Sequence, residues 1–296
     1  MAATISSNDK RRREDGLKPA PFAYAKARSV AHAIELLAND DARLLAGGQS
    51  LIATLNMRLS EPALLVDING IGGLDRLALK NAHVEIGALV RYAQAERSAE
   101  IARAAPLIAL ALPHIGHPAI RNRGTVGGSL AFADPAAELP ACVVALDGEI
   151  EIVRPQGQLT VKADDFFTGL FETALTPHDV LTAIRVPAAG ADTRVGFAEF
   201  ARRHGDYAMV GLAACARADG KRLGNLRLVY FGVGATPVRA RRAEPALADG
   251  DVEAAVKALA DDLEPADDVQ ASGAVKAHLA GVLLRRVAQQ LARVPS

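Results

Sequence analysis

Two short stretches, Ala46-Gly47-Gly48-Gln49-Ser50-Leu51 and Thr125-Val126-Gly127-Gly128-Ser129-Leu130, share a glycine pair next to a serine. Each stands where one apolar segment gives way to the next. Adjacent glycines allow positive φ angles and let a bulky group approach the backbone closely. A helix that begins at such a loop also offers unpaired N–H groups and a partial positive charge, which suit phosphate. We therefore expect the two loops to hold the two phosphates of a dinucleotide from opposite sides, although each glycine pair could instead form only a tight turn.

The better-known nucleotide-binding signatures are absent from this sequence. It contains no Gly-x-x-x-x-Gly-Lys-Ser/Thr loop and no Gly-x-Gly-x-x-Gly motif after a strand. Gly232-x-Gly234 comes closest, but Pro237 follows where a helix would have to continue. A nucleotide site in this chain therefore has to be built in another way.

Acidic residues follow the second loop, in Asp134-Pro135-Ala136-Ala137-Glu138-Leu139-Pro140. Proline is comfortable only in the first turn of a helix, so Pro140 predicts a helix that begins near Leu139 with Glu138 at its mouth. A carboxylate in that position can accept a hydrogen bond from a ribose hydroxyl, as acidic residues do in other dinucleotide sites. Capping of the helix and compensation of its dipole is an equally good interpretation.

Hydrophobic patterning predicts alternating helices and strands around these motifs. Near the first loop we expect a helix that is capped by Ser29, contains Val30 and Leu37 and ends near 39–41, then a strand at 43–46, a helix opened by Ser50 and a strand at 64–68. From 84 to 145 the chain is alanine-rich and indicates helix, with breaks at 113–118 and 121–135. Strands follow at 149–153, 159–161 and 180–186, the first two forming a hairpin.

The last hundred residues change character and predict a separate antiparallel sheet. Strands are expected at 195–201, 210–217 and 226–233, the last two joined through Ala218-Asp219-Gly220. Two helices should end the chain. An apolar stripe at helical spacing is expected to face the core, and its residues are Val275, Leu279, Val282, Leu283 and Val287.

Composition limits the classes of function. The 296 residues include 34 Lys plus Arg and 34 Asp plus Glu, so the formal net charge is zero. This balance excludes a strong whole-molecule field for nucleic acid or an anionic membrane. No run approaches the roughly 20 apolar residues of a membrane helix, so no membrane insertion is expected. Acids follow the basic run Lys10-Arg11-Arg12-Arg13 at once, and we expect residues 1–18 to be a flexible, solvated tail and not an export signal.

Cysteines and histidines point to no metal site in this chain. Its two cysteines, Cys142 and Cys215, can form neither a disulfide framework nor a four-thiolate cluster, and they fit a reducing cytoplasm. Both lie in apolar stretches and are expected to be buried and inert. His114 and His117 lie three residues apart without a clear third ligand, so we expect ordinary packing or loop roles for them.

The same motifs carry a resemblance to a known family. The segment Ala46 to Ser50, the segment Arg121-Asn122-Arg123-Gly124-Thr125-Val126-Gly127-Gly128-Ser129 and the acidic stretch at 133–140 resemble, in that order, the FAD-binding signatures of the molybdenum hydroxylases. The similarity is to their medium, flavoprotein subunit, of the xanthine dehydrogenase and carbon monoxide dehydrogenase type. Gly205-Asp206-Tyr207-Ala208 adds to it.

The resemblance implies an α+β fold with two domains. A two-lobed FAD-binding domain of the PCMH type would cover 19–188, with its α/β lobes meeting near residue 75. A smaller C-terminal domain, with a three-stranded antiparallel sheet and helices, would cover 193–296.

The resemblance also implies roles for individual residues. The two glycine loops would hold the pyrophosphate of FAD, Glu138 would meet the ribose side, Leu181 would pack near the flavin ring and Tyr207 would cover one ring face. In relatives a basic residue often stands at the place of Glu199, and a polar one at that of Phe132. The implied FAD-binding residues are Ala46, Gly47, Gly48, Gln49, Ser50, Leu51, Thr125, Gly127, Gly128, Ser129, Asp134, Glu138, Leu181 and Tyr207. No catalytic residue and no metal ligand is implied here.

The implied function is that of an FAD-binding electron-transfer subunit in a cytoplasmic heterotrimer. A large molybdopterin subunit would oxidise the substrate, and a small subunit would relay electrons through two [2Fe-2S] clusters, in an (αβγ)2 assembly. The flavin would pass the electrons to an external acceptor such as a quinone, a carrier protein, oxygen or NAD. Two alternatives stay open: a stand-alone FAD-dependent oxidoreductase using His204, Asp206 or Tyr207, and a non-catalytic nucleotide-binding assembly module.

Overall fold

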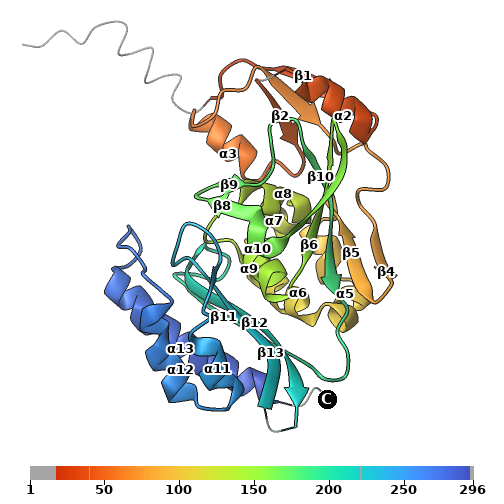
Figure 1. Ribbon diagram of the computed structural model, residues 1–296. Coiled ribbons are helices and arrows are strands. Elements are labelled where there is room, and N and C mark those ends of the chain that lie inside the picture. The colour runs from red at the N-terminus through yellow and green to blue at the C-terminus, as the bar shows by residue number, and fades with distance from the viewer. Residues whose placement is uncertain (1–17, 40, 221, 294–296) are drawn as a thin grey trace, which may run out of the picture.

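The computed structural model describes residues 18–39, 41–220 and 222–293 (Figure 1). The expected tail lies outside these ranges, except for Lys18. The described chain forms an α+β fold, as predicted, with sheets of three, five, four and two strands. Among the described residues, no helix is both long and apolar enough to cross a membrane.

The N-terminal unit is a parallel three-stranded sheet in the order β1-β3-β2, accompanied by two helices. Ser29 caps the first helix as predicted, because its hydroxyl accepts a hydrogen bond from the His32 N–H at 3.1 Å. The strands and helices of this unit are β1 (Ala23–Lys26), α2 (Val30–Leu37), β2 (Ala42–Leu45), α3 (Leu51–Asn56) and β3 (Leu64–Asp67).

A five-stranded antiparallel sheet in the order β4-β5-β10-β6-β7 follows. Its strands are β4 (Leu77–Lys80), β5 (His83–Gly87), β6 (Glu149–Arg154), β7 (Gly157–Lys162) and β10 (Val180–Pro187). The hairpin of β6 and β7 is confirmed, closing between Arg154 and Gly157. The prediction of helix is wrong at the start of 84–145, where the chain forms β5. Buried Val84 and Ile86 alternate there with half-buried Glu85, as in a strand.

Short helices pack against this sheet and carry the second glycine loop. They are α4 (Tyr92–Glu96), α5 (Ala99–Ala104), α6 (Pro106–Ala111), the 3₁₀ helix η1 (Leu112–His114), α7 (Pro118–Arg121), α8 (Val126–Phe132), α9 (Glu138–Ala145) and α10 (Ala163–Phe166). The expected break at 121–135 is therefore wrong in part, because it contains α8. The helix predicted from Pro140 is confirmed as α9. All eight of its residues are buried, and all except Glu138 are apolar.

A two-stranded hairpin of β8 (Phe167–Gly169) and β9 (Glu172–Thr173) leads back to β10. Its tip exposes Leu170 and Phe171, and Phe171 has a φ of 55°. The Phe171 ring lies edge-on to Phe132 at the end of α8, with ring centroids 5.2 Å apart.

The C-terminal part is an antiparallel sheet, β11-β12-β13-β14, with helices. Its elements are β11 (Thr193–Ala201), β12 (Ala208–Asp219), β13 (Arg222–Phe231), β14 (Val238–Arg239), α11 (Ala243–Ala248), α12 (Val252–Ala258), the 3₁₀ helix η2 (Leu259–Asp261) and α13 (Gly273–Leu291). The three predicted strands are present, but β14 adds a fourth. Three α-helices, and not two, follow the sheet.

The buried face of α13 differs from the predicted apolar stripe. Leu283 and Val287 are fully buried, but Val275 is about half exposed. Lys276 is buried instead, because its ammonium group donates hydrogen bonds to Asp268 and to the carbonyl of Gly232. A charged side chain with two partners can occupy a core position that hydrophobicity alone would not assign to it.

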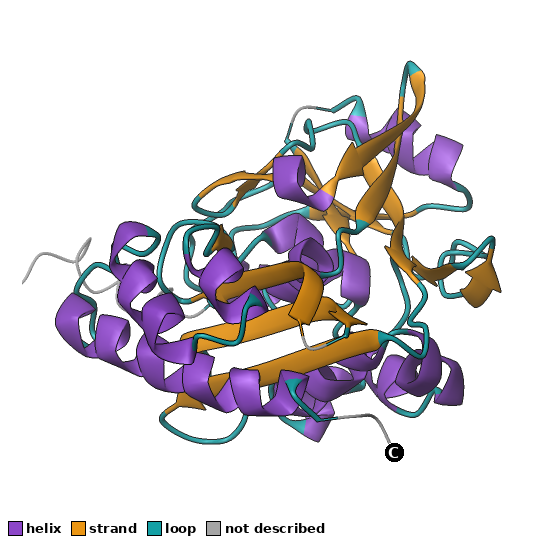
Figure 2. Ribbon diagram, turned by 60° about the horizontal axis from the view of Figure 1, so that its bottom comes forward, coloured by secondary structure: helices purple, strands orange, loops and turns teal. Residues whose placement is uncertain are grey.

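Both faces of the C-terminal sheet are covered (Figures 1 and 2). Helices α11 and α13 pack on one face, and α6 and α9 of the preceding domain pack on the other. Along β13, Leu228 and Tyr230 are buried in the core that includes residues of α11 and α13. Val229 and Phe231 are buried in the core that includes residues of α6 and α9. Successive residues of β13 are thus buried on opposite faces of the sheet. The sheet therefore joins the two domains through a continuous hydrophobic layer.

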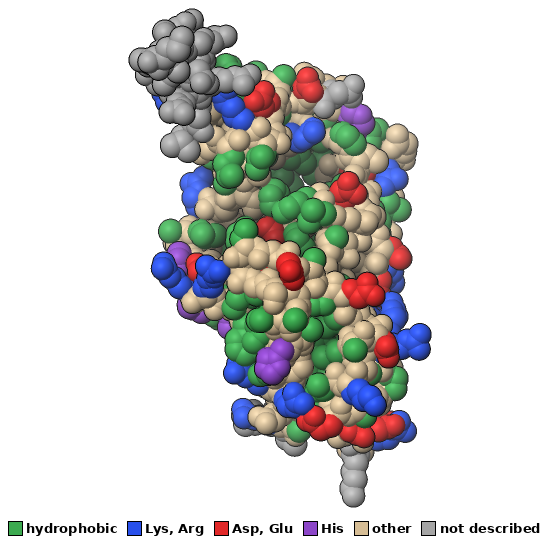
Figure 3. Space-filling model, turned by 90° about the vertical axis from the view of Figure 1, so that its left-hand side faces the viewer, with side chains coloured by type: hydrophobic (Ala, Val, Ile, Leu, Met, Phe, Trp, Pro, Cys, Tyr) green, Lys and Arg blue, Asp and Glu red, His purple; other side chains and the backbone are tan. Residues whose placement is uncertain are grey.

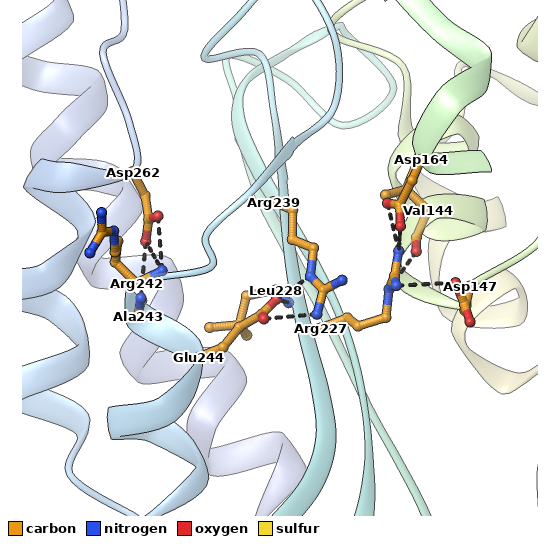
Figure 4. Close-up of polar contacts among 10 residues, drawn as sticks. All are labelled: Val144, Asp147, Asp164, Arg227, Leu228, Arg239, Arg242, Ala243, Glu244 and Asp262. Carbon is orange, nitrogen blue, oxygen red and sulfur yellow. Dashed lines mark hydrogen bonds and ion pairs between the residues drawn. The ribbon is translucent and has the colours of Figure 1, made fainter. Parts of the chain in front are cut away.

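Arg227 on β13 adds a polar clamp between the domains (Figure 4). Its guanidinium donates to the carbonyl of Val144 at 2.9 Å, to both carboxylate oxygens of Asp164 at 2.7 Å and to Asp147 at 3.1 Å. Val144 lies near the end of α9, so the clamp fixes the carboxyl end of that helix against the C-terminal sheet.

Candidate functional site

The two glycine loops lie against each other and line one cavity of about 260 Å³. A Cβ atom on Gly47 would lie 2.4 Å from the carbonyl oxygen of Arg123 and 2.9 Å from the Cα of Gly124. No side chain fits in that space, so the first loop needs glycine where it meets the second. Seen in Figure 3, the surface is hollowed between the uppermost part of the molecule and the part below it, and hydrophobic side chains gather there.

The first loop presents free backbone donors. Within the described part of the chain, the N–H groups of residues 47, 48, 49 and 50 donate no hydrogen bond. Gly48 has a φ of 72°, a left-handed conformation that turns the chain from β2 into α3. Gln49 stabilises the turn by donating from its amide to the Gly47 carbonyl at 3.1 Å. Successive unpaired N–H groups of this kind form an anion-binding concavity.

The second loop is arranged differently from the prediction. The N–H groups of Val126 and Gly127 donate to the carbonyls of Val90 and Ala88 at 3.0 and 2.9 Å, and that of Gly128 donates to the Thr125 hydroxyl at 3.1 Å. The expected unpaired N–H groups at this helix start are therefore already used. Gly127 instead allows α8 to pack closely against Ala88, because a Cβ atom on Gly127 would lie 2.5 Å from the Ala88 Cβ.

Asn69 and Arg91 tie the two loops together, and neither was identified from the sequence. The Asn69 amide donates to the carbonyl of Ala46 at 2.8 Å. Arg91 donates to the side-chain oxygen of Asn69 and to the carbonyl of Arg123. The only signal in the sequence was the Asn69-Gly70 turn after β3, which gives no indication of partners 22 and 23 residues away.

A second cavity of about 140 Å³ adjoins the first and shares part of its lining. The residues common to both are Gln49, Ser50, Tyr92, Ser129 and Phe132. Its wall toward the C-terminal domain comes from the turn between β11 and β12, where Gly205 has a φ of 84° and packs against Gly116. The second cavity therefore lies where the two domains meet.

The candidate residues divide between the two cavities. The first is lined by Ala46, Gly47, Gly48, Gln49, Ser50, Leu51, Thr125, Gly127, Gly128, Ser129 and Leu181. The second is lined by Asp134, Glu138 and Tyr207, together with the shared Gln49, Ser50 and Ser129. Leu181 is buried, whereas Tyr207 is 55% exposed at the rim. The resemblance places both residues at the flavin ring, and here they line two adjoining cavities that share part of their lining.

Glu138 is the most strongly perturbed acid in this site. Its side chain is buried at the first turn of α9, and only 6% of the residue is exposed. Burial, chiefly, and the negative charges of Glu199 and Asp134 together raise the pKa of Glu138 to about 8, against a hydrogen bond from its own backbone N–H. Burial also raises the pKa of Asp134, which accepts a hydrogen bond from the Ala136 N–H at 2.9 Å. The Glu138 carboxyl is therefore neutral in much of the physiological pH range.

The histidines and cysteines form no metal site. Among residues 18–39, 41–220 and 222–293, no group of three or more His, Cys, Asp or Glu could hold a metal ion. His114 contacts Glu199 at 3.1 Å and lies beside the rings of Phe197 and His204. Cys142 is fully buried, as predicted, but Cys215 is only half-buried.

Comparison with known proteins identifies relatives over nearly the whole chain. Residues 20–189 match the family described as the FAD binding domain in molybdopterin dehydrogenase, and residues 196–291 match the CO dehydrogenase flavoprotein C-terminal domain. The chain is 38% identical to the 6-hydroxypseudooxynicotine dehydrogenase complex subunit alpha of Paenarthrobacter nicotinovorans, over 91% of this chain and 94% of that one. It is 34% identical to the carbon monoxide dehydrogenase medium chain of Hydrogenophaga pseudoflava, over 90% and 96%.

Solved structures give the same result. A carbon monoxide dehydrogenase from Hydrogenophaga pseudoflava superposes with a TM-score of 0.90 at 35% identity, covering 92% of this chain and 98% of that one. Quinoline 2-oxidoreductase from Pseudomonas putida 86 superposes with a TM-score of 0.87 at 33% identity, covering 93% and 98%.

Proposed function

The chain belongs to the family of FAD-binding medium subunits of molybdopterin dehydrogenases, and on that premise we propose that it transfers electrons from [2Fe-2S] clusters of a partner subunit to an external acceptor. Membership makes it the flavoprotein subunit of an oxidoreductase complex. The observation that best supports the proposal is the joined double-glycine cradle, because it places unpaired backbone N–H groups in a cavity that both glycine loops line.

The residues present fit FAD. We propose that the free N–H groups of 47–50 bind the pyrophosphate, while Gly127 and Gly128 line the same cavity and Ser129 supplies a hydroxyl. The flavin ring would lie where the two adjoining cavities meet, with Leu181 packing near it and Tyr207 covering one of its faces, and Glu138 would meet the ribose side. The site assigned to FAD also includes Ala46, Leu51, Thr125 and Asp134.

Bound FAD supplies the ability to exchange electrons one or two at a time. The protein's own residues bind it, orient it and limit the access of water. Residues 19–188 would form the FAD-binding domain, with lobes meeting near residue 75, and 193–296 the C-terminal domain. In this arrangement the turn at 202–207 lets the C-terminal domain close one end of the site.

In the proposed complex, partner subunits would hold the iron–sulfur clusters and the molybdenum cofactor. The two cysteines of this chain cannot hold a [2Fe-2S] cluster, which needs four ligands. We propose a large molybdopterin subunit and a small [2Fe-2S] subunit, joined as (αβγ)2 in the cytoplasm, with a quinone, a carrier protein, oxygen or NAD as the acceptor. The relatives support this, since they are named as subunits or chains of larger dehydrogenases.

Two measurements test the proposal. The purified chain should take up FAD, seen as the visible absorption bands of oxidised flavin after gel filtration, but should not oxidise any substrate of the complex. Affinity purification from the native cell should recover a large subunit and a cysteine-rich small subunit with it. Turnover of substrate by the chain with FAD alone would instead favour a stand-alone oxidoreductase, and a protein that takes up no FAD would favour the non-catalytic module.

A further inference from the structure

The amide side chain of Asn69 holds the first glycine loop from behind. Asn69 follows β3, and its Nδ2 donates to the carbonyl of Ala46 at 2.8 Å and to Asp67 Oδ1 at 2.7 Å. Gly47 lines the first cavity, whereas Asn69 lines a separate hollow, and residues 46–49 line both. The first loop is therefore the wall between Asn69 and the cavity that both glycine loops share.

The bond from Asn69 fixes the direction of one free donor in this loop. The Ala46 carbonyl and the Gly47 N–H belong to the same peptide unit. The described residues contain no cis peptide bond, so the two groups of this planar unit point in opposite directions. With the Ala46 carbonyl directed at Asn69, the Gly47 N–H points away from Asn69, to the side of the first cavity. This N–H is one of the four that donate no hydrogen bond within the described chain.

Arg91 determines which way the Asn69 amide faces. Its guanidinium donates to Asn69 Oδ1 and to the carbonyl of Arg123. Because a guanidinium can only donate, Asn69 directs its oxygen at Arg91 and its NH2 group at Ala46. The backbone of Arg91 is itself paired with the second loop, in a bridge to Thr125. A side chain that is anchored on the second loop thus orients a peptide unit of the first.

The pair of Asn69 and Arg91 is the hydrogen-bonded connection between the two loops. In the described part of the chain, no hydrogen bond joins residues 46–51 directly to residues 121–130. The loops otherwise meet by packing, where Gly47 lies against the Arg123 carbonyl. That carbonyl is the one to which Arg91 donates, so the guanidinium lies directly beside the contact.

Positive charge gathers at this contact. Burial, chiefly, and the neighbouring Arg123 guanidinium lower the pKa of Arg91, whereas the Asp67 carboxylate raises it. The two arginines are therefore close enough to repel each other. A diphosphate bound to the N–H groups of 47–50 carries negative charge and would offset this repulsion.

We propose that Asn69 and Arg91 are positioning residues for the diphosphate of FAD: Arg91 orients the Asn69 amide, and Asn69 turns the Gly47 N–H toward the phosphate oxygens. This inference rests on the proposed function, which assigns the diphosphate to the first loop. Neither side chain lines the first cavity, so both act through the backbone of the loop. Without the bond from Asn69, the peptide unit between Ala46 and Gly47 is free to rotate, and its N–H loses its fixed direction.

The test uses the full chain, freed of FAD and titrated with FAD. Asn69→Ala removes the donor to Ala46. Arg91→Met removes the donor to Asn69 but keeps most of the length of the side chain, and a double variant combines the two changes. Asn122→Ala is the matched control, because Asn122 is exposed near the second loop and its side chain makes no hydrogen bond within the described residues. The ³¹P NMR spectrum of each chain saturated with FAD reports the surroundings of the two phosphates.

We expect each single variant to raise the Kd for FAD at least about tenfold, because an aligned hydrogen bond to a charged group contributes that much. The Kd of the double variant should rise much less than the product of the two single effects, since Arg91 acts through Asn69. In both single variants, at least one ³¹P resonance of bound FAD should move toward its position in free FAD. Asn122→Ala should match the wild type in both measurements.

Three results would overturn these roles. One is a wild-type Kd in either single variant that folds, and another is a double variant in which the two losses multiply. The third is a weaker affinity with ³¹P resonances at their wild-type positions, because the residues would then act only through the stability of the loops. If one variant does not fold, the other decides. A wild-type chain that takes up no FAD would contradict the proposed function itself, and not the roles of Asn69 and Arg91.

Discussion

Glu138→Gln should remove a large part of the pH dependence of folding stability in the FAD-free chain. The pKa of Glu138 is about 8 in the folded protein, raised chiefly by burial, against 4.5 as its ordinary value. Between these two values the folded chain holds a proton that the unfolded chain has released. The free energy of unfolding must therefore fall as the pH rises through this window, and this contribution levels off below about 4.5 and above about 8.

The size of the effect follows from the same two values. Each pH unit inside the window costs about 1.4 kcal/mol, so the wild type should lose about 2.7 kcal/mol from this group between pH 5.5 and 7.5. Glutamine has nearly the same shape and does not titrate. The difference in the free energy of unfolding between Glu138→Gln and the wild type should therefore change by about that amount across the two units, in favour of the variant at high pH.

Urea denaturation at pH 5.5, 6.5 and 7.5, at constant ionic strength, measures this difference. The chain contains no tryptophan, so far-UV circular dichroism is the suitable signal. Glu35→Gln, on the exposed face of α2, is the control and should run parallel to the wild type. If the Glu138→Gln curve also runs parallel to the wild type, Glu138 is not the buried neutral acid that the structure indicates.

Three further predictions concern the cradle and the domain contact. Gly47→Ala should weaken FAD binding or folding by about 1–3 kcal/mol, because the new Cβ atom would meet the Arg123 carbonyl. Gly72→Ala is the control and should have little effect, because the space around Gly72 is open. Titration of the two variants with FAD compares them. Arg227→Met should cost about 1–3 kcal/mol by removing the hydrogen bonds that the guanidinium donates to the Val144 carbonyl and to the Asp164 carboxylate, and limited proteolysis should then cut faster at 188–192; equal cleavage rates would contradict the clamp. Tyr230→Phe should cost about 1–2 kcal/mol in thermal unfolding, because its buried hydroxyl donates to the Ala280 carbonyl at 3.0 Å; an unchanged midpoint would contradict this.

Local chemistry explains why several features could be predicted from the sequence. The Ser29 cap, the β6–β7 hairpin and the start of α9 each depend on residues within a few positions of one another. The glycine pairs are local in the same sense, since a turn with close backbone approach is a property of the glycines themselves. The contact between the two loops agrees with the expectation that they face one site.

The errors come from contacts between distant residues. At 84–87, alanine-rich neighbours favoured helix, but pairing with β4 and β10 fixes a strand. That same region supplies the Ala88 and Val90 carbonyls that occupy the N–H groups at the start of α8, which no local pattern reveals. The bridge from Asn69 through Arg91 to Arg123 joins three separate parts of the chain. The burial of Lys276 likewise depends on Asp268 and Gly232.

Helix α9 connects the second cavity to the contact between the two domains. Its eight residues make a rod about 12 Å long, at 1.5 Å per residue. Glu138 stands at one end, and Arg227 grips the other end through Val144. The same short helix therefore connects the contact between the two domains to the acid that lines the second cavity, so a change in how the C-terminal sheet sits against α9 reaches the pocket directly.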